Sequence, residues 1–209
     1  MTRPVVMLIH GGFWQAAYDA RLMDALDADL RHDGWATRNI EYRRLGNGGG
    51  WPATFDDVLA EVDAVGATPI VTVGHSAGGQ LALWAAAERG LAGTVAQAGV
   101  LDLRGAATKR VGRDTAQRLL GGTPDAVPER YAAASPLERV PFGVPQLVVH
   151  GERDDTVPVA MSRAYVEAAR AACDEVEYVE LAGVGHFEHI DPASTAWAAV
   201  RTWLDARWG

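Results

Sequence analysis

Apolar residues in this chain occur in short continuous runs, separated by longer segments with helical spacing. The runs are rich in Val, Ile and Leu, as expected of strands that are buried on both faces of a sheet. The predicted strands cover residues 5–9, 35–42, 70–73, 94–100, 146–150 and 176–181. The pattern therefore predicts about six strands.

Helical patterns separate these strands and are expected over residues 22–34, 54–65, 77–89, 159–172 and 191–204. We expect Thr54 to cap the second of these helices and Asp191, followed by Pro192, to open the last. Repeated strand–helix units predict an α/β fold, with a mostly parallel sheet and helices on both faces. Residues 101–142 contain no strand pattern, so we interpret them as a short cap-like insertion in a single domain, residues 1–209.

Ligands of such folds bind at the carboxyl ends of the strands, so the motifs that directly follow strands are the candidates for chemistry. The third strand runs into Gly74-His75-Ser76-Ala77-Gly78-Gly79, and a helix follows. A Gly-x-Ser-x-Gly turn between a strand and a helix is a nucleophile elbow, which holds its serine in a strained conformation above the sheet. We therefore predict Ser76 as a nucleophile.

The first strand ends in His10-Gly11-Gly12-Phe13-Trp14. Tandem glycines let the backbone approach a substrate and turn its amides inward, where they can stabilise an oxyanion. We assign this role to the amides of Gly12 or Phe13, together with the amide of Ala77 after the nucleophile. The alternative is a tight turn in which Trp14 packs in the core.

The acid of a catalytic triad has to lie at a strand end, where it accepts a hydrogen bond from a histidine. Asp154 and Asp155 both follow the fifth strand, and their spacing does not separate them. Either residue could instead cap the helix that begins after Pro158. Asp102, after the fourth strand, is a third candidate that we interpret as a turn residue opening the insertion.

The general base is expected after the last strand, in Gly183-Val184-Gly185-His186-Phe187-Glu188-His189. We favour His186 because glycines precede it, and we expect His189 to be a surface or capping residue. The two histidines have a metal-binding spacing, but no further ligand cluster accompanies them, so we predict no metal. His75 is expected to pack, and His10 and His150 to hydrogen-bond within their own loops.

Four motifs of this chain resemble the α/β-hydrolase superfamily: His10-Gly11-Gly12-Phe13-Trp14, Gly74-His75-Ser76-Ala77-Gly78-Gly79, Gly151-x-x-Asp154-x-x-Val157-Pro158 and Gly185-His186-Phe187. Within it, the first motif is similar to that of small carboxylesterases and arylformamidases (kynurenine formamidases). The resemblance implies that Asp154, three residues after a glycine, is the acid rather than Asp155. It also implies a Ser76–His186–Asp154 triad that hydrolyses small esters through an acyl-enzyme, with no cofactor.

Two other functions stay open at this point. An arylformamidase would use the same residues on N-formyl aromatic amines, and a protein of this fold could bind a ligand without catalysis. We expect Trp14 and Trp51 to contact the substrate.

Composition narrows the partners and the compartment. The net charge of −8 argues against nucleic acid and anionic membranes. No segment approaches the roughly 20 apolar residues of a membrane span, and the single cysteine allows no internal disulfide. We therefore expect a cytoplasmic protein that acts on a small-molecule ester or amide. A homodimer through Trp203 or Trp208 is possible, although packing of both side chains on the sheet is the preferred interpretation.

Overall fold

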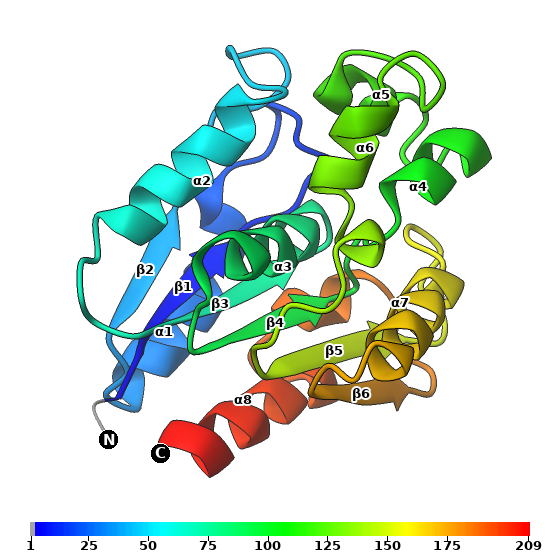
Figure 1. Cartoon of the computed structure of the whole chain (residues 1–209). Helices are drawn as coiled ribbons and strands as arrows, with labels where there is room; N and C mark the ends of the chain where they lie inside the picture. Colours follow the sequence, from blue (N-terminus) through cyan, green and yellow to red (C-terminus); the bar gives the residue numbers. More distant parts are fainter. Residues whose placement is uncertain (1–2) are drawn as a thin grey trace.

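The sheet of this protein has six parallel strands in the order β2-β1-β3-β4-β5-β6 (Figure 1). The computed structural model describes residues 3–209. The strands are β1 (Val5–Ile9), β2 (Thr37–Ile40), β3 (Ile70–His75), β4 (Gly93–Gln97), β5 (Gln146–Gly151) and β6 (Val176–Leu181). The helices are α1 (Asp24–His32), α2 (Ala53–Asp63), α3 (Ala77–Arg89), α4 (Leu103–Lys109), α5 (Thr115–Leu120), α6 (Pro128–Ala134), α7 (Val159–Ala171) and α8 (Thr195–Trp208). Three 3-10 turns complete the set: η1 (Ala20–Met23), η2 (Pro136–Glu138) and η3 (Phe187–Ile190).

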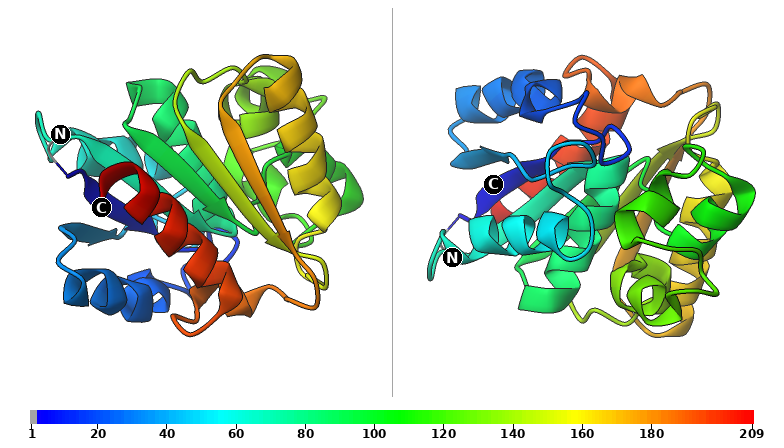
Figure 2. Two further views of the ribbon diagram at one scale, coloured as in Figure 1. Left: turned by 90° about the horizontal axis from the view of Figure 1, so that it is seen from below. Right: turned by 90° about the horizontal axis from the view of Figure 1, so that it is seen from above.

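Helices cover both faces of the sheet, as the alternating pattern predicts. Helices α1 and α8 lie on one face, and α2, α3, α7 and the insertion lie on the other (Figure 2). Each face has its own apolar core, because neighbouring residues of a buried strand point to opposite sides. Val6 and Leu8 of β1 belong to the core beneath α1 and α8, whereas Met7 and Ile9 belong to the core on the α2–α3 side.

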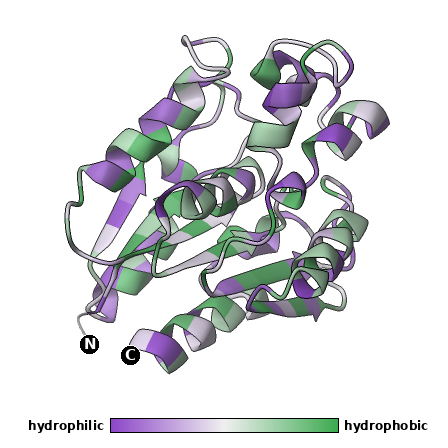
Figure 3. Cartoon of the chain, viewed as in Figure 1, coloured by the Kyte–Doolittle hydropathy of each residue, from purple (hydrophilic) through white to green (hydrophobic). Residues whose placement is uncertain are grey.

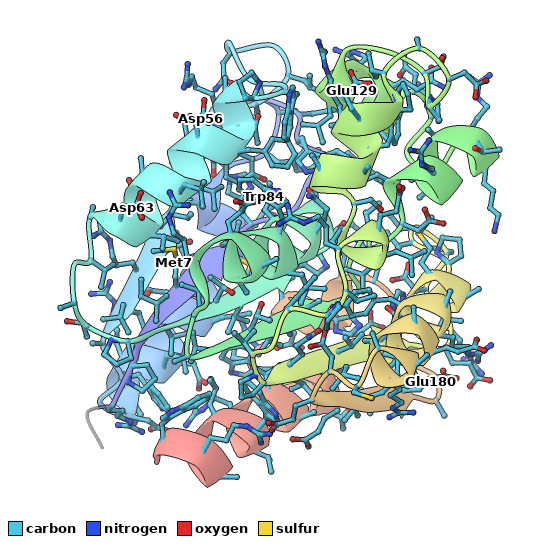
Figure 4. The ribbon with its side chains drawn as sticks, in the orientation of Figure 1. Met7, Asp56, Asp63, Trp84, Glu129 and Glu180 are labelled. Atoms are coloured by element: carbon cyan, nitrogen blue, oxygen red, sulfur yellow. The ribbon has the colours of Figure 1, made fainter. Side chains whose placement is uncertain are left out.

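Hydropathy follows this layering. The central strands are largely hydrophobic, and purple, hydrophilic surfaces lie on the outside of the helices and along the edge strand β2 (Figure 3). Met7 and Trp84 lie inside the molecule, while Asp56, Glu129 and Glu180 lie at its periphery (Figure 4).

Strand order reverses at β1, which pairs with β2 on one side and with β3 on the other. In open α/β sheets, ligands bind in the crevice outside such a reversal, at the carboxyl ends of the strands. The loop after β1 and the elbow after β3 both lie at this crevice. A Cβ atom added to Gly11 would lie 2.9 Å from the Cβ of Ser76, so only glycine allows the two turns to touch.

Most predicted elements are confirmed, but several boundaries differ; strand β4, for example, ends at Gln97 rather than at residue 100. Strand β2 is only four residues long, because it pairs on one side only. Helix α2 begins before Thr54, whose hydroxyl is buried and donates to the Arg43 carbonyl at 2.6 Å. Helix α8 begins after Ser194, whose hydroxyl accepts from the Trp197 amide at 3.0 Å, so Asp191 is not its cap.

The insertion between β4 and β5 is helical, as expected, and consists of α4, α5, α6 and η2. Asp102 caps α4 by accepting from the Gly105 amide at 2.8 Å, which confirms its interpretation as a turn residue. Trp203 is buried against the sheet, and the ring of Trp208 packs edge-on against the ring of Trp203. This packing accounts for both side chains without a second copy. Among residues 3–209, no helix is both long and apolar enough to cross a membrane.

Candidate active site

Ser76 occupies a strained turn between β3 and α3. Its φ of 55° and ψ of −119° lie in a region that non-glycine residues rarely adopt. The turn is possible because its flanking glycines pack backbone on backbone: a Cβ atom would lie 2.0 Å from a carbonyl oxygen at Gly74 (the oxygen of Gly78) and likewise at Gly78 (the oxygen of Ile9). The predicted elbow is thus present, and it presents Ser76 at the strand ends.

Three backbone amides near Ser76 are free to bind an oxyanion. The N–H groups of Gly12, Phe13 and Ala77 donate no hydrogen bond to any part of residues 3–209. Gly12 and Phe13 have positive φ angles, 101° and 51°, which turn this short stretch out of the strand direction. Ala77 is the first residue of α3, so its amide also carries the positive end of the helix dipole.

His10 fixes the orientation of this loop. Its Nδ1 donates to the Gly11 carbonyl at 2.8 Å, and its Nε2 accepts from Arg44 at 3.2 Å. Because a trans peptide is planar, holding the Gly11 carbonyl also sets the opposite direction of the Gly12 N–H. Burial lowers the pKa of His10, which favours the neutral ring that this bonding pattern requires. The expected local role of His10 is therefore confirmed.

Asp154 and His186 form a short, buried pair. Nδ1 of His186 donates to Oδ2 of Asp154 at 2.7 Å, and the side chains are 4% and 0% exposed. The other carboxylate oxygen accepts from the amides of Thr156 at 2.9 Å and Val157 at 2.7 Å. Burial alone would raise the pKa of Asp154, but the hydrogen bonds from His150 and His186 outweigh it and lower that pKa. Asp155 is exposed and, within residues 3–209, its side chain accepts one hydrogen bond, from the Thr156 hydroxyl, so the geometry favours Asp154 as the acid.

Ser76 and His186 line the same small pocket, of about 50 Å³, together with Gly12 and Phe13. No hydrogen bond joins the Ser76 hydroxyl to His186 in this structure; such contacts are often long before substrate binds and tighten in its complex. Sequence reasoning did not identify the remaining lining residues, which are Tyr18, Leu22, His75, Thr156, Phe187 and Ile190. Phe187 is 63% exposed and Tyr18 is 43% exposed, so both form an apolar rim open to solvent. Phe187 directly follows the predicted general base, and this position could have identified it as a pocket residue.

Trp14 and Trp51 do not line this pocket, contrary to expectation. Trp14 is 1% exposed and donates from its indole nitrogen to Gln80 at 3.1 Å, inside the core on the α2–α3 side. Trp51 packs on the same core with its ring against Phe55, 4.9 Å between centroids. A large aromatic ring beside a glycine turn gains more by filling the core than by facing the crevice.

His189 is buried rather than at the surface, which corrects its predicted role. Its two ring nitrogens have no hydrogen-bond partner among residues 3–209, and burial lowers its pKa to about 3. His150 is confirmed as a local residue: Ser162 lies 2.7 Å from its Nδ1, and its Nε2 donates to the Val157 carbonyl at 3.0 Å. Within residues 3–209, no cluster of His, Cys, Asp and Glu has the geometry of a metal site.

We expect the stability of the protein to fall as the pH is lowered from about 6.5 towards 3. His189 stays neutral in the folded state in this range but takes up a proton once unfolded, so acid favours the unfolded chain. Each such histidine contributes a slope of about 1.4 kcal/mol per pH unit. Urea unfolding between pH 7 and pH 4 measures this slope. His189→Leu should flatten it, and an equal slope in this variant would contradict the assignment.

A strained serine between a parallel strand and a helix, with an aspartate and a histidine after later strands, defines the α/β-hydrolase class. The fold and the order Ser76, Asp154, His186 place this chain in that class. More narrowly, the chain belongs to the family described as BD-FAE, whose model matches residues 1–168.

A curated relative and several solved structures are also similar to this chain. The chain is 32% identical, over 222 aligned residues, to esterase LipC of Mycobacterium tuberculosis; the match covers 92% of this chain and 55% of that protein. The chain thus spans about half the length of this curated relative. A truncated carbohydrate esterase from gut microbiota has the same fold, with a TM-score of 0.84, 19% identity, and coverage of 99% of this chain and 86% of that one. An esterase of Thermogutta terrifontis, solved with propionate bound, gives a TM-score of 0.75 at 21% identity, covering 98% and 82%.

Proposed function

We propose that this protein is a serine hydrolase of small carboxylic esters. The observation that carries the proposal is the convergence of Ser76, His186 and two free amide donors on one pocket, with Asp154 bonded behind His186. The similarity to esterase LipC supports the same activity. Only ester or amide acyl transfer needs all of these groups at once: a nucleophile, a base held in one tautomer and a cradle for an oxyanion.

The reaction follows from the geometry. Ser76 Oγ attacks the ester carbonyl carbon while Nε2 of His186 takes the hydroxyl proton. Asp154 holds the Nδ1–H of His186, which leaves the lone pair on Nε2 facing the pocket. The amides of Ala77 and of Gly12 or Phe13 bind the oxyanion, and His186 returns its proton to the departing alcohol. Water, activated by the same histidine, then hydrolyses the acyl-enzyme.

The pocket favours a short acyl group. Its volume of about 50 Å³ is well below the roughly 300–1,000 Å³ of pockets that enclose drug-sized ligands. The decisive experiment is a series of p-nitrophenyl esters of increasing chain length, with N-formylkynurenine assayed in parallel and labelling by a fluorophosphonate. Fastest turnover of the shortest esters supports the proposal. Turnover of the N-formyl amide alone would favour an arylformamidase, and absence of both turnover and labelling would reject a serine hydrolase.

We expect Phe187→Ala to raise KM for esters of aromatic alcohols by about 3- to 10-fold with little change in kcat. Phe187 offers exposed apolar surface at the pocket rim but no group for the chemistry, and burying an aromatic ring is worth about 1–3 kcal/mol. Steady-state kinetics with phenyl and methyl acetate measure the difference. An equal change for both esters would remove Phe187 from leaving-group binding.

We further propose that the protein works in the cytoplasm on a small-molecule ester, without nucleic acid or membrane as partner. The single cysteine and the net charge of −8 support this proposal. Fractionation of cells that produce the protein, followed by ester assays of each fraction, tests the compartment.

A further inference from the structure

Two side chains at the carboxyl ends of β3 and β4 hold the loop that carries His186. Nε2 of His75 lies 3.0 Å from the backbone oxygen of His186, and Nε2 of Gln97 donates to the backbone oxygen of His189 at 2.8 Å. Both side chains are buried, at 2% and 0% exposure. The two carbonyls are three residues apart, so the contacts grip the η3 turn at both ends.

The two anchors form a rigid pair. His75 and Gln97 are register partners on neighbouring strands in the middle of the sheet. The Ser76 amide also donates to the Gln97 carbonyl at 2.8 Å, which extends the β3–β4 pairing into the elbow. The same strand ends therefore set the position of the nucleophile and of the loop that bears the base.

The protonation state of His75 follows from its contact. A carbonyl oxygen accepts, so Nε2 of His75 carries the proton and donates it. Burial, with the nearby rings of His186 and His189, lowers the pKa of His75 well below 6.5 and keeps this ring neutral. A neutral donor fixes the loop without adding a positive charge next to the imidazole of His186.

Besides these two hydrogen bonds, packing of Val184 and Ile190 against the core on the α1–α8 side holds the loop. Phe187 and Glu188 are exposed, and the other backbone anchor near His186 is the Arg153 amide, which donates to the Val184 carbonyl at 2.9 Å. Among residues 3–209, the imidazole itself makes one hydrogen bond, to Asp154, and its ring packs beside those of His75 and Phe187. If the backbone of the loop were not held, the ring could shift about Asp154 and away from the Ser76 hydroxyl.

We infer that His75 and Gln97 are positioning residues that clamp the η3 turn and keep Nε2 of His186 over Ser76 Oγ, an inference that rests on the proposed serine hydrolase function. The ring nitrogens of His189 take no part in this clamp, because they have no partner; the residue contributes its backbone carbonyl. The clamp explains why a histidine directly precedes the nucleophile although the chemistry does not use it.

The test compares His75→Leu and Gln97→Met with the unmodified protein on a short p-nitrophenyl ester. Each substitution removes one donor at similar volume, and a base displaced by about 1 Å can cost up to about 100-fold in rate. We expect kcat to fall about 10- to 100-fold in both variants. KM should stay within about 2-fold in Gln97→Met, because Gln97, unlike His75, does not line the pocket. His75→Gln, which restores an amide donor of similar reach, should recover kcat to within about 3-fold of the unmodified protein.

Thr72→Val is the matched control. Thr72 hydrogen-bonds Thr94 at 2.9 Å across the same two strands, away from the η3 turn. The same hydroxyl also lies 3.2 Å from the Ala82 carbonyl, so its removal should lower Tm by several degrees, the size expected for one or two buried hydrogen bonds, and leave kcat within about 2-fold. Amide hydrogen exchange over residues 182–190 should speed up in His75→Leu and Gln97→Met but not in Thr72→Val.

The outcomes separate the clamp from the proposed function. Unchanged kcat and unchanged exchange in a folded His75→Leu would overturn the clamp, as would failure of His75→Gln to rescue. If His75→Leu does not fold, Gln97→Met tests the grip from the other strand. In the unmodified protein, nitrogen NMR must find His75 as the neutral Nε2–H tautomer, and an Nδ1–H tautomer would reject the clamp without any variant. If the unmodified protein shows neither turnover nor labelling, the proposed function fails. Faster amide exchange of residues 182–190 in His75→Leu and Gln97→Met would still show, independently of activity, that these two side chains hold the η3 turn.

Discussion

Ser76→Ala is expected to lower kcat/KM for a short p-nitrophenyl ester by at least about 10⁴-fold and to abolish fluorophosphonate labelling. The reason is chemical, because the substitution deletes the only atom that can form the acyl-enzyme. Gly12, Phe13 and Ala77 keep their free amides, so substrate can still bind in the cradle. Mass spectrometry of the labelled protein, with steady-state kinetics, measures both losses.

A matched control is Ser194→Ala, which removes a serine hydroxyl that only caps α8. This variant should keep full labelling and turnover, with a Tm lowered by a few degrees, the size expected for one lost cap. The Ser76→Ala protein should unfold within a few degrees of the unmodified protein, since only a hydroxyl is lost. Retained labelling in Ser76→Ala would place the nucleophile elsewhere in the chain.

Asp154→Asn is expected to lower kcat by about 10⁴-fold while the fold and KM change little. One side-chain oxygen accepts from the amides of Thr156 and Val157, and the asparagine carbonyl keeps that place. Its NH₂ group then faces Nδ1 of His186, which must accept a hydrogen bond instead of donating one. The proton of the imidazole moves to Nε2, so the histidine can no longer take the proton of Ser76.

The control for this variant is Asp155→Asn, at the neighbouring position. Asp155 is exposed and touches only the Thr156 hydroxyl, at 3.1 Å, so its replacement should leave kcat within about 2-fold. Kinetics of the two variants above pH 7, where other protonation effects are small, give the comparison. Equal losses in both variants would remove Asp154 from its role as the orienting acid.

The elements that the sequence predicted well are those specified by local signals. The elbow depends on glycines at positions 74 and 78, and these are required by contacts within a few residues of Ser76 and with the strand beside it. The helix 77–89 and its glycine end match α3 and Gly90, which adopts the left-handed conformation. The strand after α3 was likewise predictable from its run of hydrophobic residues, and the helical insertion from the absence of such a run.

The predictions that failed depended on what surrounds a residue. Trp14 follows an oxyanion-type motif, yet its ring meets Gln80, a residue 66 positions away that no local pattern connects to it. His189 was expected to be a surface or capping residue, but the η3 turn directs it inward, where its ring stacks on that of His75 at 6.3 Å between centroids. Asp154 could not be separated from Asp155 by spacing, because a one-residue choice depends on which carboxylate His186 can reach.

The sequence by itself determined the parallel α/β layout and the identity of the serine turn. Both depend on hydrophobic periodicity and glycine positions, which act over a few residues and can be read directly from the chain. The family resemblance already pointed to Asp154, and the tertiary structure shows that this carboxylate meets His186. Only the tertiary structure decided which aromatic rings rim the pocket and that His75 and Gln97 hold the base loop. The hydrogen bonds of His186 to Asp154 and His75, and of His189 to Gln97, join residues 32, 111 and 92 positions apart. Residues this far apart in the sequence come together only where strand ends meet at one edge of the sheet. Packing on both faces of the sheet sets which of these residues come into contact.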